Sequence, residues 1–132
     1  MKTKYPLCYK NGGYEARCCG KGWDLLLDRC LAAIEAELAA KPELQEGFYI
    51  NDIKEKFGTL RFYFNGGNDV IEAVVAEAEF WSARTCESCG NPGILVSAGH
   101  WVSTRCPECK KPDEVWTRKL SDWIKMEDTR IK

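Results

Sequence analysis

The sequence lacks the features by which several classes of enzyme are recognised. It contains one histidine, and it has no Gly-x-Ser-x-Gly motif, no phosphate-cradling glycine loop and no metal-hydrolase motif. Acid–base and nucleophilic options are therefore confined to carboxylates, tyrosines and cysteines. A Cys19 nucleophile paired with His100 is one such option, although nothing in the sequence brings the two together. We expect a protein that is not an enzyme.

Long hydrophobic runs are also absent. No segment approaches the ~20 apolar residues that a membrane span requires, and the first eight residues lack the apolar core of a signal peptide. These absences predict a cytoplasmic protein with no membrane partner. Thiols stay reduced in the cytosol, so the eight cysteines indicate metal binding or buried thiols rather than a disulfide framework.

An excess of charge of one sign is missing as well. The formal net charge is −1, whereas proteins dedicated to nucleic acids usually carry a clear basic excess, because their affinity comes largely from neutralising phosphates. The overall charge thus argues against nucleic acid as the main partner. No motif indicates a small-molecule substrate.

Two Cys-x-x-Cys pairs dominate the C-terminal third of the chain. The cysteines are Cys86, Cys89, Cys106 and Cys109, and 16 residues, 90–105, separate the two pairs. Pairs on tight turns let four sulfurs converge on one ion, and this spacing is typical of a tetrahedral zinc site. Four thiolates leave no open position, so we expect one structural Zn ion without a catalytic role. His100 would be a surplus donor, and we expect it to be a structural or surface residue.

Four further cysteines lie outside these pairs: Cys8, Cys18, Cys19 and Cys30. Cys30 falls on the apolar stripe of a predicted helix and is most simply a small core residue. The other three fit no ligand spacing that we can defend, so their role stays open. A second metal site, built from them and a distant donor, is the alternative.

Two amphipathic helices and a β-hairpin are predicted before the cysteine pairs. Apolar residues recur at helical spacing over 23–40 and again over about 69–84, where Asn68 or Asp69 supplies an N-cap. Between the helices, alternating residues predict strands over about 48–55 and 59–64. The residues expected to face the core are Trp23, Leu27, Ile34, Leu60, Phe62, Phe64, Val70, Ile71, Val74, Val75, Ala78 and Trp81.

The order of these elements predicts an α+β fold. Two helices should pack on a β-hairpin or small antiparallel sheet, to which the N-terminal segment adds a strand in one alternative. An integral zinc ribbon or treble-clef element follows, with a hairpin of 94–96 and 101–104. Helical spacing from Val115 onward then predicts a terminal helix. No linker separates the α-β core, 1–84, from the metal element, 85–132, so we expect one compact unit.

Three motifs carry a resemblance to a known family. They are CGKGW at 19–23, KEKFGTLRFY at 54–63 and AEAEFWSARTCESCGNPG at 76–93. With these motifs the chain resembles a family of small, uncharacterised zinc-knuckle proteins of bacteria and bacteriophages. The resemblance implies that the helix, hairpin and knuckles belong to one architecture. It also implies a phage or prophage accessory protein in the cytoplasm of a bacterial host cell.

Two functional hypotheses follow. The first is a protein-interaction module that binds and modulates or inhibits a host or phage protein, for instance in antiviral defence. Trp101 and Trp116 are its candidate anchors, because tryptophan, tyrosine and arginine are the usual interface anchors. The alternative is a nucleic-acid-binding zinc knuckle, in which Arg105, Lys110 and Lys111 contact phosphates while the two tryptophans stack on bases.

Overall fold

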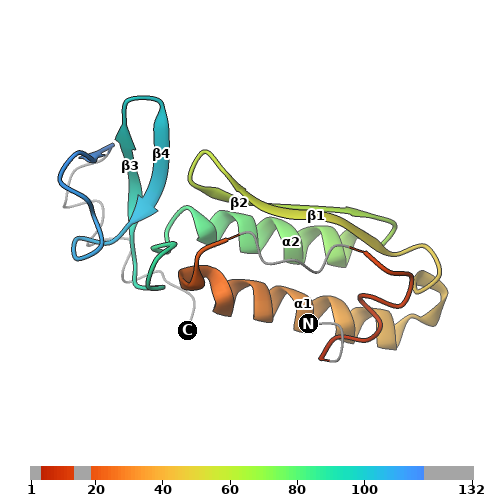
Figure 1. Ribbon diagram of the computed structural model, residues 1–132. Helices are drawn as coiled ribbons and strands as arrows, with labels where there is room; N and C mark the ends of the chain where they lie inside the picture. The colour runs from red at the N-terminus through yellow and green to blue at the C-terminus, as the bar shows by residue number, and fades with distance from the viewer. Residues whose placement is uncertain (1–3, 14–18, 118–132) are drawn as a thin grey trace.

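The computed structural model describes residues 4–13 and 19–117 and confirms the α+β fold. Helix α1 spans Asp24–Ala40 and helix α2 spans Asp69–Ser82, and the two lie side by side beneath a β-hairpin (Figure 1). The hairpin consists of β1, Tyr49–Lys56, and β2, Thr59–Asn65. A second sheet, called the metal lobe together with its cysteine turns (residues 85–117), stands at one end of this core (Figure 1).

The helices bury the faces that the sequence predicts, with one exception. Residues of α1 at i, i+3 and i+4 spacing are buried, and Trp23, which ends a short 3-10 helix before α1, is fully enclosed. On α2, Asn68 is the N-cap and accepts a hydrogen bond from the backbone N–H of Ile71 at 3.0 Å. Val70 was expected in the core but is 46% exposed. It lies one residue, about 100° of helix rotation, from the buried stripe that begins at Ile71.

The β1–β2 hairpin packs on the helices through Leu60, Phe62 and, in part, Phe64, as expected. The strands are joined by a two-residue turn in which Phe57 and Gly58 both have positive φ, 54° and 78°. Positive φ at both central positions is the feature of a type I′ turn, which matches the natural twist of a hairpin. The N-terminal stretch 4–13 forms turns, so within the described residues this sheet has two strands.

Side chains of α2 cover the free edge of β2. The backbone N–H of Leu60 donates to Oγ of Ser82 at 2.8 Å, and that of Phe62 donates to Oε2 of Glu79 at 3.0 Å. These bonds satisfy donors that an edge strand would otherwise present to another chain. Glu79 and Ser82, within the motif at 76–93, therefore have a structural role.

The metal lobe contains three antiparallel strands in the order β4-β3-β5. Strands β3, Ile94–Ala98, and β4, Trp101–Arg105, form the predicted hairpin, and β5, Val115–Trp116, pairs with β3. The prediction of a helix starting at Val115 is wrong at these two residues, because they pair as a strand with the open edge of β3. The rest of the predicted terminal helix lies outside the described residues. A strand rather than a helix follows the second cysteine pair, so residues 85–117 are ribbon-like rather than a treble clef.

Candidate metal centre and the surfaces around it

The four predicted cysteine ligands converge in the metal lobe. Their sulfur atoms all lie within 4.8 Å of one another, and Sγ of Cys89 is 3.5 Å from Sγ of Cys106. A tetrahedral ion with metal–sulfur bonds of about 2.3 Å would hold its sulfurs about 3.8 Å apart. The cluster therefore has the size and donor set of a potential metal site.

Local backbone geometry lowers the pKa of Cys86 in the first cysteine pair, whereas burial raises that of Cys89. Burial raises the pKa of the Cys86 thiol, but backbone N–H groups of Cys106, Cys89 and Ser88 outweigh it, and the net pKa lies below its usual value. Such N–H donors stabilise a thiolate and so support metal ligation. Cys86 and Cys106 are buried, whereas Cys89 reaches the surface.

The CGKGW segment docks directly on the first knuckle. The N–H of Gly22 donates to the carbonyl of Glu87 at 2.9 Å, and Nε1 of the buried Trp23 donates to the carbonyl of Thr85, also at 2.9 Å. A Cβ atom on Gly22 would overlap the carbonyl oxygen of Cys86. Only glycine permits this approach of two backbones. The motif therefore joins the start of α1 to the metal lobe.

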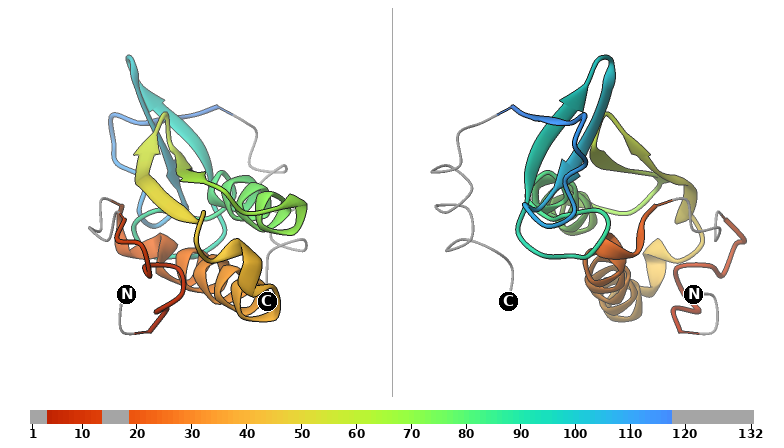
Figure 2. Two further views of the ribbon diagram at one scale, coloured as in Figure 1. Left: turned by 90° about the vertical axis from the view of Figure 1, so that its right-hand side faces the viewer. Right: turned by 60° about the vertical axis from the view of Figure 1, so that its left-hand side comes forward.

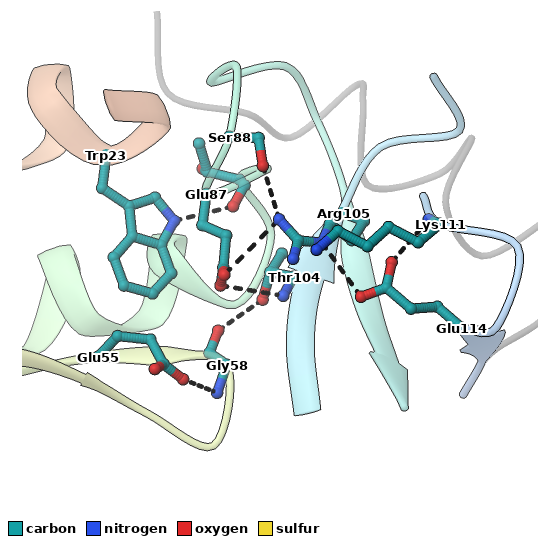
Figure 3. Close-up of polar contacts among 10 residues, drawn as sticks. Trp23, Glu55, Gly58, Glu87, Ser88, Thr104, Arg105, Lys111 and Glu114 are labelled. Carbon is teal, nitrogen blue, oxygen red and sulfur yellow. Dashed lines mark hydrogen bonds and ion pairs between the residues drawn. The ribbon is translucent and has the colours of Figure 1, made fainter. Parts of the chain in front are cut away.

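Arg105 occupies a different place from the one expected of a partner-binding residue. It is 8% exposed, and its Nε donates to Oε2 of Glu114 at 3.3 Å, while Nη1 donates to Oγ of Ser88 at 2.6 Å (Figure 3). Nη1 also lies 3.7 Å from Oε1 of Glu87. The guanidinium therefore ties both knuckles to the loop before β5 and is buried by these contacts.

The polar network continues to the tip of the β1–β2 hairpin. Oγ1 of Thr104 donates to the carbonyl of Gly58 at 2.6 Å, and the N–H of Gly58 donates to Oε2 of Glu55 at 2.7 Å (Figure 3). Gly58 packs on the backbone of Ser103, where a side chain at residue 58 would collide. Figure 2 shows the hairpin tip lying against β4. The tip is thereby fixed to the metal lobe.

Of the other candidates near the second cysteine pair, Lys110 lies beside Trp116, whereas Lys111 contacts Glu114. Nζ of Lys110 lies 5.8 Å from the ring centroid of Trp116, which is half-buried in β5. Lys111 is exposed and uses its backbone N–H to bind Oε1 of Glu114 at 2.8 Å. With Arg105 enclosed, the part of the expected basic cluster that falls within the described residues consists of two lysines beside one tryptophan.

Trp101 is the most exposed large hydrophobic side chain among the described residues, at 71%. It lines a cavity of about 220 Å³ with Phe57, His100, Glu55 and Val102. Phe57, at 63% exposure, comes from the tip of the other hairpin. The sequence did not identify Phe57 as a candidate interface residue, because Phe57 falls in the connection between the two predicted strands. The signal that could have identified it is an aromatic residue in a tight turn, because few neighbouring side chains can bury a residue at a hairpin tip.

The cysteines outside the pairs have different surroundings. Cys8 and Cys30 are buried in the helix-side core, where burial raises the pKa of both thiols, that of Cys30 to about 12. Sγ of Cys8 lies 3.5 Å from the carbonyl oxygen of Leu31, to which it donates. Cys19 is half-buried against the same core, whereas His100 is in the turn between β3 and β4. Cys18 lies outside the described residues.

No protein-family model, curated protein or solved structure matches this chain. In the described part of the chain, no helix combines the length and apolar character needed to cross a bilayer.

Proposed function

We propose that this protein is a metal-stapled module that binds another protein through the surface where its two hairpins meet. The observation that carries the proposal is the exposure of Trp101 and Phe57, 71% and 63%, on either side of one cavity. Large aromatic side chains on a rigid frame are the usual anchors of protein interfaces. The contacts of Gly58 with Ser103 and Thr104 supply that rigidity here.

The role that we propose for the metal is structural, and zinc is the ion that best suits it. Four cysteines complete a tetrahedral zinc shell and leave no position for water or substrate. The proposal is accordingly one of binding and not of catalysis. Its partner is a host or phage protein in the bacterial cytoplasm, which the protein modulates or inhibits. This choice of partner follows the motif resemblance to bacterial and bacteriophage zinc-knuckle proteins.

A pull-down with paired variants tests the proposal. Tagged protein is incubated with nuclease-treated bacterial lysate, and bound proteins are identified by mass spectrometry. The Trp101→Ala, Phe57→Ala double variant should lose a partner that the unmodified protein retains near stoichiometry, because several kcal/mol of interface energy typically resides in such anchors. Val115→Ala, an exposed change at the opposite edge of the same sheet, should retain it. A partner that survives loss of both aromatics contradicts the proposed surface.

Nucleic acid is a second candidate, favoured by the outer face of the β1–β2 hairpin. By strand alternation this face, opposite the buried Leu60 and Phe62, carries Lys54, Lys56, Arg61 and the exposed Tyr63. Nζ of Lys54 lies 5.6 Å from the Tyr63 ring centroid and 3.6 Å from Oδ2 of Asp52. Basic groups around exposed aromatics are the elements of a single-strand platform.

Salt dependence tests this second candidate. If a single strand lies on the outer face, the affinity for an oligothymidylate should fall with salt by about 0.7 log unit per phosphate contact for each decade. Lys54→Gln should reduce this slope by the amount that corresponds to about one phosphate contact, whereas Lys110→Gln, at the second knuckle, should leave the slope unchanged. A flat salt response, measured by fluorescence anisotropy, would exclude the nucleic-acid candidate.

A further inference from the structure

The cavity between the hairpin tips has an acidic and aromatic lining. Its lining residues are Glu55, Phe57, His100, Trp101 and Val102, so two aromatic residues and one acidic residue border it. One oxygen of the Glu55 carboxylate, Oε2, accepts the Gly58 N–H at 2.7 Å. Within residues 4–13 and 19–117, the second oxygen accepts no hydrogen bond. The lining therefore combines two aromatic residues with a carboxylate that keeps one oxygen without a donor in this part of the chain.

We propose that this cavity binds an arginine side chain of the partner protein. The inference rests on the proposed function and specifies which chemistry the surface recognises. A guanidinium can stack flat on an aromatic ring while its N–H groups bind a carboxylate, and tryptophan is the ring that attracts cations most strongly. The cavity of about 220 Å³ offers both interactions from opposite hairpins.

Other occupants suit this lining less well. An anionic side chain would face the Glu55 carboxylate and the negative faces of two rings. An apolar side chain would remove water from Glu55 without replacing its hydrogen bonds, which costs free energy. The Glu55 carboxylate thus favours a cation over an anionic or apolar side chain, and the planar, five-donor guanidinium favours arginine over lysine.

The protein already holds one cation beside this cavity. Nζ of Lys56 lies 5.7 Å from the ring centroid of Phe57. The contact shows that the ring is accessible to an ammonium group. It also makes Lys56 an internal competitor, because its charge repels an incoming guanidinium. Removal of this lysine should therefore strengthen binding of an arginine.

A matched pair of peptides tests the inference on the whole metal-loaded chain. The probes are acetyl-Gly-Gly-Arg-Gly-Gly-amide and the same peptide with citrulline, the neutral isostere of arginine. Binding is followed by NMR at the indole N–H of Trp101, identified by its loss in Trp101→Phe. The arginine peptide should bind about three- to tenfold more tightly than the citrulline peptide, the range that one cation–π and carboxylate contact provides. A lysine peptide should fall between them.

Two variants assign the preference to this cavity. Glu55→Gln keeps an acceptor for the Gly58 N–H but removes the charge, so the preference for the arginine peptide over the citrulline peptide should shrink to what the aromatic rings alone provide. Lys56→Ala should raise the affinity for arginine. The buried Trp23 indole, which donates to the Thr85 carbonyl, should keep its chemical shift in both variants and so report an intact fold.

Several outcomes would overturn the inference. They are equal affinity for the arginine and citrulline peptides, no shift of Trp101 at millimolar peptide, or an unchanged preference in Glu55→Gln. A shift of the same resonance by oligothymidylate alone would also overturn it, in favour of the nucleic-acid candidate. If the peptides show no preference while the pull-down still depends on Trp101 and Phe57, the arginine inference fails and the protein-binding function stands.

Discussion

Replacing Cys86 by serine is expected to remove the metal and unfold the metal lobe. Cys86 is fully buried, so the variant leaves three thiolates around an incomplete site. Structural zinc sites supply on the order of 10 kcal/mol to folding, which rivals the whole stability of a small domain. The ion content should fall from one per chain to none by elemental analysis. Amide hydrogen exchange should become fast in β3 and β4.

Cys86→Ser should also affect the α-β core, at the start of α1. Gly22 and Trp23 donate hydrogen bonds to the carbonyls of Glu87 and Thr85, so the start of α1 should lose protection with the knuckle. A chelator should reproduce this pattern in the unmodified protein. Cys30→Ala, which removes a buried thiol from α1, is the control and should keep the metal. Full metal content and unchanged exchange in Cys86→Ser would contradict the site.

Arg105→Met is expected to destabilise the protein by about 3–5 kcal/mol. The substitution keeps the volume of the side chain but leaves two carboxylates facing each other in the lobe, and Glu114 is only 5% exposed. Breaking a buried ion pair by removing one partner has this magnitude because the remaining charge is uncompensated. Urea denaturation of the metal-loaded protein measures the change.

Two further substitutions isolate the cause. Arg105→Lys keeps the positive charge but has one nitrogen in place of the forked guanidinium, so its loss of stability should be smaller than that of Arg105→Met. Arg29→Met, at an exposed position of α1, should lie within about 0.5 kcal/mol of the unmodified protein. If Arg105→Met behaved like Arg29→Met, the network would have no part in stability.

The elements that sequence reasoning located are those with local signals. The period of Leu27, Leu31 and Ile34 identifies α1 without knowledge of what covers it. Alternation likewise locates the two strands of the hairpin, although the observed register shifts between Ile50 and Asp52. The metal cluster was predictable because ligand spacing within each pair is a short-range property. Local pattern and observed structure agree wherever the pattern alone selects one conformation.

The features that were missed depend on partners distant in the chain. Val115 and Trp116 fit a helical period, but the edge of β3, about 20 residues earlier, pairs with them as a strand. Arginine is usually a surface residue, and Arg105 is buried only because Glu87 and Glu114 pair with it. Phe57 and Trp101 become neighbours because Gly58 packs on Ser103. None of these contacts repeats at the period of a helix or a strand, so no local pattern predicts them.

The contact between Trp23 and Thr85 sets an order of events during synthesis. The two residues are 62 positions apart, so a ribosome adding about 5–20 residues per second needs about 3–12 s to complete the interval. Until then the indole of Trp23 lacks its acceptor, and Gly22 lacks the carbonyl of Glu87. The remaining ligands, Cys106 and Cys109, emerge later still. If the four cysteines hold an ion, as we propose, its capture comes after this contact can form, and a cell short of metal would accumulate chains with formed helices and an incomplete metal lobe.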